Sequence, residues 1–153
     1  MLDLILPIQR LEFGVPITAR DQPDLARIPE VYQAGLGGFW VGLEGGRVVG
    51  TIGLLAFGAP PRGGGALRKM FLHRDLRGSG LAQALLDTLL ARACSQGLPG
   101  IWLGTLPQMG AAHRFYERNG FRRVEPEDLP PAFPRMAVDT VFYALELPRD
   151  PAR

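Results

Sequence analysis

The chain has 153 residues, 46% of them hydrophobic, which suits a single domain over residues 1–153 with a sizeable core. Its net charge is only +2 and its arginines are scattered, so despite a sequence pI of about 9.1 the pattern argues against nucleic-acid binding. No apolar run approaches the roughly 20 residues that a membrane-spanning helix needs, and the single cysteine, Cys94, excludes an internal disulfide.

The N-terminal part of the chain is predicted to be helical. Apolar residues recur at helical spacing from Leu4 to Leu11, and Gly14 and Pro16 end this element. Charged residues interrupt the apolar N-terminus and no cleavage site follows it, so we expect no signal peptide and a cytoplasmic protein. A second helix is predicted over residues 23–34.

Strands and helices intermix in the rest of the chain. Strands are predicted over residues 39–43, 48–57, 66–73, 101–106, 121–124 and 138–147. Helices are predicted over residues 81–96 and 111–119, and loops over the glycine-rich residues 58–65 and the proline-rich residues 126–134. Because several connections are hairpins, we expect an α+β fold with α/β/α-like layers, in which helices flank a mixed, mostly antiparallel central sheet.

One segment, residues 67–86, runs from a strand through a glycine-containing turn into a helix. The turn glycines, Gly78 and Gly80, let the backbone approach a ligand closely, and the first N–H groups of the following helix have no partner inside it. These groups carry the positive end of the helix dipole, and Arg77 adds a fixed positive charge. The sequence therefore predicts a phosphate-binding turn, although it lacks the lysine-containing loop of an NTPase.

Two motifs together resemble the GNAT N-acetyltransferase superfamily. That family's signature, Gln/Arg-x-x-Gly-x-Gly/Ala, is matched by Arg77, Gly80 and Ala82. A second run, Ala112-His-Arg-Phe-Tyr-Glu-Arg-Asn-Gly-Phe121, is similar to the family's late helix, Ala-x-x-Phe/Leu-Tyr-Glu-Lys-x-Gly-Phe. The resemblance covers residues 39–147 and implies the GNAT acyl-CoA N-acyltransferase fold.

The resemblance implies acetyl-CoA as co-substrate and no metal ion. The backbone of Met70, Phe71 and Leu72 would bond the pantetheine arm. The pyrophosphate would lie on the turn residues Arg77, Gly78, Ser79, Gly80, Leu81 and Ala82. Tyr116 matches the family's tyrosine near the thioester sulfur. Its phenol, with an ordinary pKa of about 10, would protonate the leaving thiolate after direct attack by an amine.

Two features depart from the family pattern. Met109 stands where the family often has Asn, three residues before Ala112. The family also usually opens with a strand, whereas this chain opens on a predicted helix. The first strand is therefore missing, is replaced by a partner, or lies within residues 2–6, and a homodimer is left open.

The acceptor side of the reaction is less defined by the sequence. An ammonium must lose a proton before attack, yet no carboxylate lies between Glu44 and Asp75. The central strands thus supply no general base, and the alternative is that the proton is removed through water. Arg68 and Lys69 put positive charge on the strand before the turn, which suggests an acceptor that carries a carboxylate. Asp139, at the start of the predicted final strand, is a further candidate for substrate binding.

The resemblance thus predicts an N-acetyltransferase that acts on a small-molecule amine, amino-acid-like if it carries a carboxylate. A peptide or protein acceptor and a non-catalytic acyl-CoA-binding sensor are the alternatives. Cys94 is expected to be inert packing, and with His73 and His113 it does not have metal-ligand spacing. We expect neither a nucleic acid nor a membrane as partner.

Overall fold

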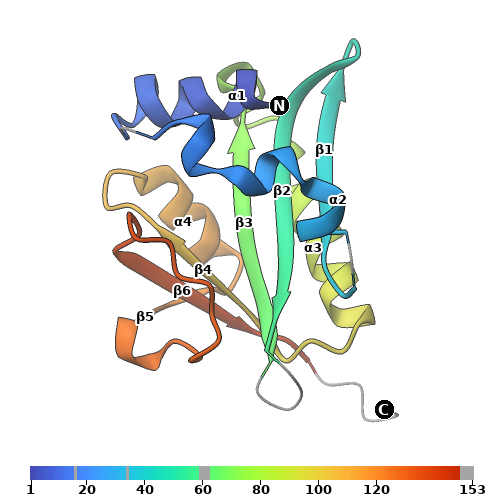
Figure 1. Ribbon diagram of the computed structural model, residues 1–153, viewed down its shortest axis with the longest axis vertical. Helices are drawn as coiled ribbons and strands as arrows, with labels where there is room; N and C mark the ends of the chain where they lie inside the picture. Colours follow the sequence, from blue (N-terminus) through green and yellow to red (C-terminus); the bar gives the residue numbers. More distant parts are fainter. Residues whose placement is uncertain (16, 34, 59–62, 149–153) are drawn as a thin grey trace.

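The computed structural model describes residues 1–15, 17–33, 35–58 and 63–148, and in this part six strands form one sheet in the order β1-β2-β3-β4-β6-β5 (Figure 1). The strands are β1 (Gly38–Glu44), β2 (Arg47–Phe57), β3 (Gly64–Leu72), β4 (Gly100–Thr105), β5 (Arg122–Val124) and β6 (Val141–Glu146). Neighbouring strands are antiparallel except β3 and β4, which are parallel. The predicted mixed, mostly antiparallel sheet is confirmed.

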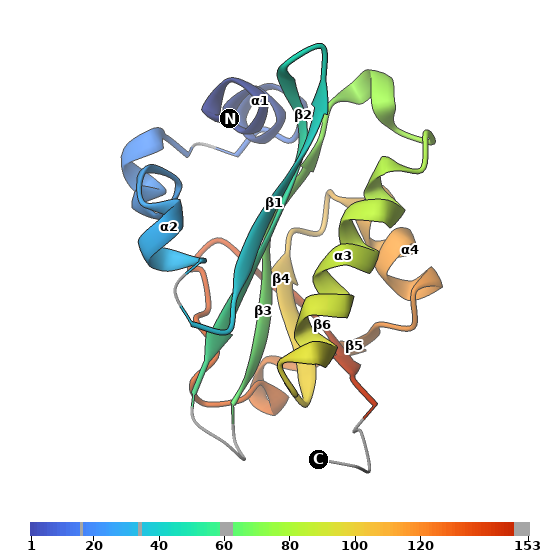
Figure 2. The ribbon, with the colours of Figure 1, turned by 90° about the vertical axis from the view of Figure 1, so that its right-hand side faces the viewer.

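Helices cover both faces of this sheet. They are α1 (Leu2–Pro7), continued by a π-helical turn (Ile8–Glu12), α2 (Ile28–Val31), α3 (Leu81–Ser95) and α4 (Gly110–Arg118), with 3₁₀ turns at Ala19–Asp21, Pro23–Ala26, Arg74–Leu76 and Pro126–Asp128. Figure 2 shows α1 and α2 on one face and α3 and α4 on the other. The predicted α+β layers are confirmed, and no described helix is long and apolar enough to cross a membrane.

The main core lies between α3 and the sheet. Leu86 and Leu89 of α3 are fully buried in one cluster with Ile52 and Leu54 of β2. The spacing of the two leucines keeps them on one face of the helix. Burial of each such side chain contributes about 1.5–3 kcal/mol. This packing fixes the start of α3 beside the end of β3, where the predicted phosphate turn lies.

A β-bulge interrupts β3. The pairing moves from Thr51↔Phe71 to Gly53↔Arg68, so β3 carries one more residue than β2 across this step. Lys69 lies in the bulge with φ +54°, and its carbonyl accepts a 2.7 Å hydrogen bond from the Thr51 hydroxyl. The bulge interrupts the regular alternation of side chains along the strand, and residues 67–71 line one cavity beside it.

The two parallel strands separate soon after they meet. β3 and β4 pair only at Gly65↔Ile101 and Ala66↔Trp102, although β3 continues to Leu72 and β4 to Thr105. The edge of β3 at residues 70–72 therefore has no strand partner on the β4 side. This opening is where the family resemblance locates the pantetheine arm.

The N-terminal helix was predicted correctly, but the second helix was not. The chain is helical from Leu2 to Glu12, whereas residues 23–31 form a 3₁₀ turn followed by the four-residue α2. Pro29 explains the break, because it lacks an N–H group and its ring clashes with the carbonyl four residues earlier in a continuous helix. Residues 1–37, apart from 16 and 34, which lie outside the described residues, form no strand.

Two other boundaries differ from the prediction. Gly64 and Gly65 belong to β3 rather than to the predicted loop, of which residues 59–62 lie outside the described residues. A Cβ at Gly64 would stand 2.4 Å from the Trp102 ring, so close packing explains this glycine. The final strand begins at Val141 rather than at residue 138, because residues 136–139 form a turn closed by a 3.1 Å hydrogen bond from the Asp139 N–H to the Met136 carbonyl.

Candidate active site

The predicted phosphate turn joins β3 to α3. Gly78 and Gly80 have φ values of +82° and +91°, a conformation that glycine adopts without strain. A Cβ at either position would meet no atom within 4 Å, so the space beside the turn is open. The first N–H groups of the 15-residue α3 follow directly and lack helical acceptors. The turn therefore has the shape and polarity to hold a diphosphate.

Arg77 has a protein partner that the sequence did not predict. Its guanidinium forms a two-pronged ion pair with Glu12 of the π-helical turn, in which Nη2 lies 2.9 Å from Oε2, and Nη2 also donates to the Leu72 carbonyl at 3.1 Å. Hydrogen bonding to Arg77 holds the pKa of Glu12 below its usual value. A phosphate that binds Arg77 must therefore share this arginine with Glu12 or displace it.

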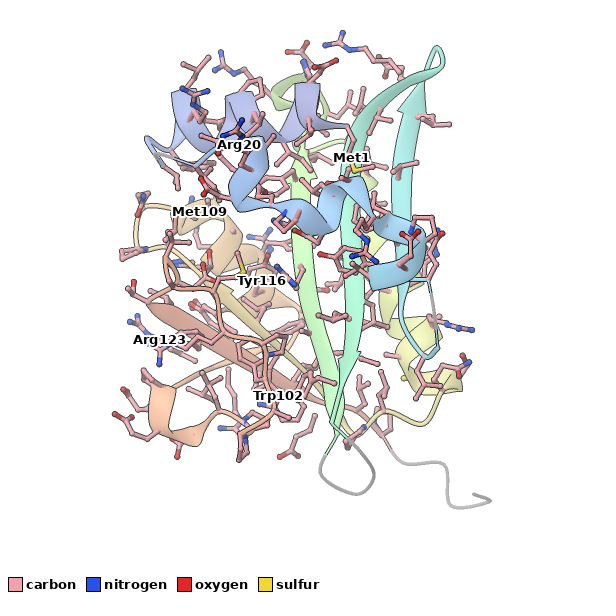
Figure 3. All side chains as sticks on the ribbon, viewed as in Figure 1. Met1, Arg20, Trp102, Met109, Tyr116 and Arg123 are labelled. Atoms are coloured by element: carbon pink, nitrogen blue, oxygen red, sulfur yellow. The ribbon has the colours of Figure 1, made fainter. Side chains whose placement is uncertain are left out.

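A narrow cavity of about 120 Å³ lies where β3 and β4 diverge. Its walls come from β3, β4, α4, the π-helical turn and residues 133–139. The polar side chains among the lining residues are those of Gln9, Arg68, Lys69, Thr105, Tyr116 and Asp139. Figure 3 shows Tyr116 beside the gap between β3 and β4. The cavity thus brings together the predicted catalytic residue and all three predicted substrate-binding residues.

Tyr116 projects from α4 into this region and is only 6% exposed. Its hydroxyl lies 3.9 Å from the sulfur of Met70 on β3, and the rings of Phe121 and Tyr143 pack around it with centroids 5.6 and 6.0 Å away. Burial, with a smaller contribution from Asp139, raises the pKa of Tyr116 above its usual value. The phenol is therefore neutral at physiological pH and carries a proton to donate.

Arg68 and Asp139 bring opposite charges to the cavity without pairing. One guanidinium nitrogen of Arg68 lies 3.1 Å from the sulfur of Met136. Neither Arg68 nor Asp139 has an ion-pair partner within 4.0 Å among the described residues. Burial raises the pKa of Asp139 to about 6, although Arg68, Lys69 and Arg135 oppose this shift.

Lys69, by contrast, is engaged by the protein. Its ammonium donates a 2.7 Å hydrogen bond to Gln22 and lies 3.8 Å from a carboxylate oxygen of Asp24. Gln22 exchanges two hydrogen bonds with Gln9, and Asp24 accepts one from Tyr32 at 2.5 Å. Burial lowers the pKa of Lys69. Of the two cations predicted to bind substrate, Arg68 is the one without a carboxylate partner.

The remaining candidates have ordinary structural surroundings. Met109, the departure from the family pattern, lines the cavity, and its sulfur accepts a 3.4 Å hydrogen bond from Thr105. A ring nitrogen of His113 lies 2.8 Å from the Leu106 carbonyl, which agrees with a structural role. Cys94 is exposed, so the prediction that it packs in the interior is wrong. Across the described ranges, no three His, Cys, Asp or Glu residues are grouped as metal ligands.

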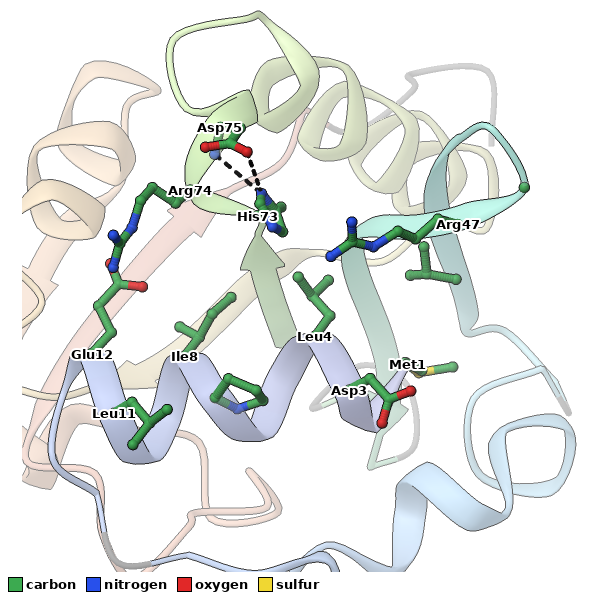
Figure 4. Close-up of a pocket in the computed structure, with 13 residues that line it drawn as sticks. Met1, Asp3, Leu4, Ile8, Leu11, Glu12, Arg47, His73, Arg74 and Asp75 are labelled. Carbon is green, nitrogen blue, oxygen red and sulfur yellow. Dashed lines mark hydrogen bonds and ion pairs between the residues drawn. The ribbon is translucent and has the colours of Figure 1, made fainter.

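A larger groove of about 780 Å³ runs along α1 (Figure 4). It lies between α1, the β1–β2 hairpin and residues 73–75, where a ring nitrogen of His73 is 3.6 Å from the Asp75 carboxylate. Its lining includes Glu12 but not Tyr116, Arg68 or Asp139. The groove is therefore separate from the cavity at the strand opening.

Two features of the site were not predicted from the sequence. Glu12 lies 65 positions from its partner Arg77, and the only local signal was a carboxylate in an apolar helix. Gly104 leaves room for Asp139, because a Cβ there would stand 2.6 Å from Oδ2 of Asp139. Neither pairing has a short-range pattern from which it could be read.

Known proteins resemble this chain in sequence and structure. The chain matches the Acetyltransferase (GNAT) family over residues 2–121. It is 38% identical over 104 residues to "N-acetyltransferase 8" of Rattus norvegicus, which covers 65% of this chain and 46% of that protein. It is 34% identical over 125 residues to "N-acetylaspartate synthetase" of Danio rerio, which covers 80% of this chain and 44% of that protein.

A crystal structure gives the same result for the fold. An acetyltransferase of the GNAT family from Staphylococcus aureus Mu50 is similar with a TM-score of 0.90 and 37% identity, over 96% of this chain and 91% of that one. The chain spans about half the length of the two sequence relatives, 46% and 44%. The family match, which includes the phosphate turn and the late-helix motif, establishes that the chain belongs to the GNAT acetyltransferase family.

Proposed function

We propose that the protein transfers the acetyl group of acetyl-CoA to the amine of a small molecule that carries a carboxylate, as an amino acid does. The observation that carries this proposal is the Arg68 guanidinium, which lines the narrow cavity beside Tyr116 without a carboxylate partner among the described residues. The reaction is direct attack of the amine on the thioester, with no covalent enzyme intermediate.

The donor side of this proposal rests on the turn and on the strand opening. The N–H groups at the start of α3 and the open space beside Gly78 and Gly80 suit the pyrophosphate of CoA. The edge of β3 at residues 70–72 has no strand partner on the β4 side, although the Leu72 carbonyl accepts from Arg77, and it offers backbone groups to the amides of the pantetheine arm. A thioester that follows this path ends near Tyr116.

The acceptor side rests on charge. A half-buried guanidinium with no carboxylate within 4.0 Å among the described residues favours an anionic ligand, and the arginine fork matches a carboxylate with two parallel hydrogen bonds. The contact with Met136 leaves the other nitrogens of Arg68 available. Lys69 is engaged by Gln22 and Asp24, so it contributes positive potential rather than a direct contact.

The size of the cavity favours a small acceptor over a peptide. At about 120 Å³ it is smaller than the roughly 300–1,000 Å³ of common ligand pockets. Arg68, which has no carboxylate within 4.0 Å among the described residues, disfavours a basic peptide. The relative from Danio rerio is named for a product that is an acetylated amino acid, which supports the same acceptor class.

Tyr116 is the proposed general acid. Its buried, neutral phenol lies beside Met70, at the edge of the path proposed for the thioester. It donates its proton to the sulfur as the carbon–sulfur bond breaks. This donation also argues against the sensor alternative, because a domain that only binds acyl-CoA has no need for a proton donor here.

The proposal is tested by thiol release from acetyl-CoA with paired acceptors. Each L-α-amino acid is compared with the primary amine that lacks only its carboxylate. We expect kcat/KM for the best amino acid to exceed that of its paired amine by about 10-fold or more, the worth of a hydrogen-bonded charge contact. Equal kcat/KM values for every pair would contradict the proposal that the acceptor carries a carboxylate. CoA binding without turnover of any amine would support the sensor.

A further inference from the structure

Among the described residues, one carboxylate lines the cavity, that of Asp139. Asp139 lines the cavity with Tyr116 and Arg68 and has no ion-pair partner within 4.0 Å in the described part of the chain. We propose that Asp139 is the general base that takes a proton from the ammonium of the acceptor and so generates the attacking amine. The inference rests on the proposed function in one respect, that the acceptor is an amine.

The backbone holds Asp139 in a defined position. The N–H group of Asp139 donates to the Met136 carbonyl at 3.1 Å, and that of Thr140 donates to the Thr105 carbonyl on β4 at 3.2 Å. Its carboxylate lies over Gly104, where a Cβ would stand 2.6 Å from Oδ2 and 2.9 Å from Cγ. The carboxylate thus occupies space that only a glycine at position 104 leaves free.

The titratable groups that face Asp139 come from three parts of the chain. Arg68 and Lys69 face it from β3, Arg135 from its own segment, and Tyr116 from α4. Lys69 shares its charge with Asp24. Burial outweighs the three cations and raises the pKa of Asp139 to about 6. At neutral pH the group is therefore ionised, yet it is a stronger base than an aspartate with the ordinary pKa of 3.8.

The proton and electron balance of the step is complete. Asp139 takes one proton from the ammonium, which frees the nitrogen lone pair. The nitrogen bonds to the thioester carbonyl carbon, the carbon–sulfur bond breaks, and Tyr116 gives its proton to the sulfur. The second nitrogen proton leaves as the amide forms and restores the phenol, and Asp139 releases its proton to water. The net products are the amide, the CoA thiol and one proton.

The two residues assist each other. The negative charge of Asp139 contributes to the raised pKa of Tyr116. Once Asp139 has taken the proton from the acceptor, it is neutral and this contribution disappears. Tyr116 then becomes a better acid at the stage when the leaving sulfur needs a proton.

The test compares wild type with Asp139→Asn across pH, with the best acceptor from the paired panel. We expect kcat/KM of the variant to fall by about 10²–10³-fold at pH 7, within the usual range for loss of a general base. The difference in kcat/KM between the variant and wild type becomes smaller as the pH approaches the pKa of the amine, because the acceptor then arrives already deprotonated and does not need Asp139. The Kd for CoA is unchanged. A deficit that is constant from pH 6.5 to 9.5 overturns the proposal.

Two further variants separate catalysis from folding. Asp128→Asn changes an exposed aspartate and leaves the pH profile unchanged. Gly104→Ala retains Asp139 but displaces its carboxylate, so it shows the same pH-dependent deficit. A normal profile in Gly104→Ala, with the variant folded by circular dichroism, counts against Asp139.

The pH dependence of stability gives a readout that needs no turnover. The folded-state pKa of Asp139 lies above its ordinary value of 3.8, so ionisation of this group costs stability as the pH rises from about 4 to 6. We expect Asp139→Asn to have a higher Tm than wild type at pH 7 and an equal Tm near pH 4. An equal Tm at both pH values contradicts a half-buried carboxylate that is ionised at pH 7.

The outcomes distinguish this inference from the proposed function. If amines without a carboxylate are acetylated as fast as amino acids, the carboxylate preference fails. Asp139 is then tested on those amines. If amino acids are preferred but Asp139→Asn retains its rate at pH 7, the general base fails and the acceptor class stands.

Discussion

Arg68 lies beside a β-bulge in β3. The extra residue, Lys69, interrupts the regular pleating of the strand there, and both residues line one cavity. Lys69 is then held by Gln22 and Asp24, while Arg68 has no carboxylate partner among the described residues. Arg68 is therefore the residue at which recognition of a carboxylate is best tested.

Replacement of Arg68 by alanine is expected to weaken acceptor binding. The lost charge-assisted hydrogen bonds are worth about 1.5–3 kcal/mol, so KM for an amino-acid acceptor rises about 10- to 100-fold, with a smaller effect on kcat. Steady-state kinetics at saturating acetyl-CoA measure this. Arg118→Ala is the matched control, because Arg118 is an exposed arginine outside the cavity lining. Unchanged KM in Arg68→Ala would count against a carboxylate contact.

Removal of the Tyr116 hydroxyl is expected to slow the chemical step. Tyr116→Phe retains the buried ring, so CoA affinity is preserved while kcat falls about 10²-fold, at the lower end for a lost general acid. Tyr143→Phe is the control, because it removes a hydroxyl bonded to Glu117 from an adjacent ring. If Tyr116→Phe turns over at the wild-type rate, the proton comes from another donor.

At the scale of elements, the π-helical turn after α1 connects the donor and acceptor sides. Glu12 pairs with Arg77 of the phosphate turn, and Gln9, one helical turn earlier, lines the acceptor cavity and bonds Gln22. A ligand that displaces Glu12 from Arg77 therefore acts on the helical segment that forms one wall of the acceptor cavity.

The variant Glu12→Gln tests the competition for Arg77. It weakens a surface ion pair worth about 0.2–1 kcal/mol, so CoA is expected to bind about two- to five-fold more tightly. Isothermal titration gives this Kd, with the exposed Glu30→Gln as control. Weaker CoA binding in Glu12→Gln would mean that Glu12 orients Arg77 for the phosphates rather than competing with them.

The turn before α3 is tested by a pair of glycine substitutions. Gly80 and Gly45 both have left-handed φ values, +91° and +58°, and a Cβ at either meets no atom within 4 Å. Each alanine substitution is expected to cost about 1 kcal/mol of folding stability. Only Gly80→Ala should also raise the Kd for CoA, because its Cβ occupies the space proposed for the pyrophosphate. Equal effects of both on CoA binding would contradict the location of the turn site.

At the scale of the whole molecule, the sequence predicted most of the regular elements correctly. The row of leucines in α3 and the glycines around the phosphate turn are local patterns with local physical causes. The family, the sheet class and the order of the elements followed from them. The prediction of the second helix was wrong because Pro29 interrupts the apolar pattern that favours it.

The acceptor side of the site was not readable from the sequence because its contacts are long-range. Asp139 lies at the cavity because residues 136–139 form a turn, whereas the sequence pattern predicts the start of a strand there. Its carboxylate also needs a glycine at position 104 on another strand. The central strands therefore give no sequence signal for this carboxylate. The Glu12–Arg77 pair joins two sides of the fold in the same way.

The most direct test of the central claim is a crystal structure of the protein with CoA bound. We expect the pyrophosphate on the N–H groups of residues 78–82, the pantetheine arm between β3 and β4, and the sulfur within hydrogen-bond distance of the Tyr116 hydroxyl. CoA bound in the groove along α1 instead, with its sulfur remote from Tyr116, would contradict the account.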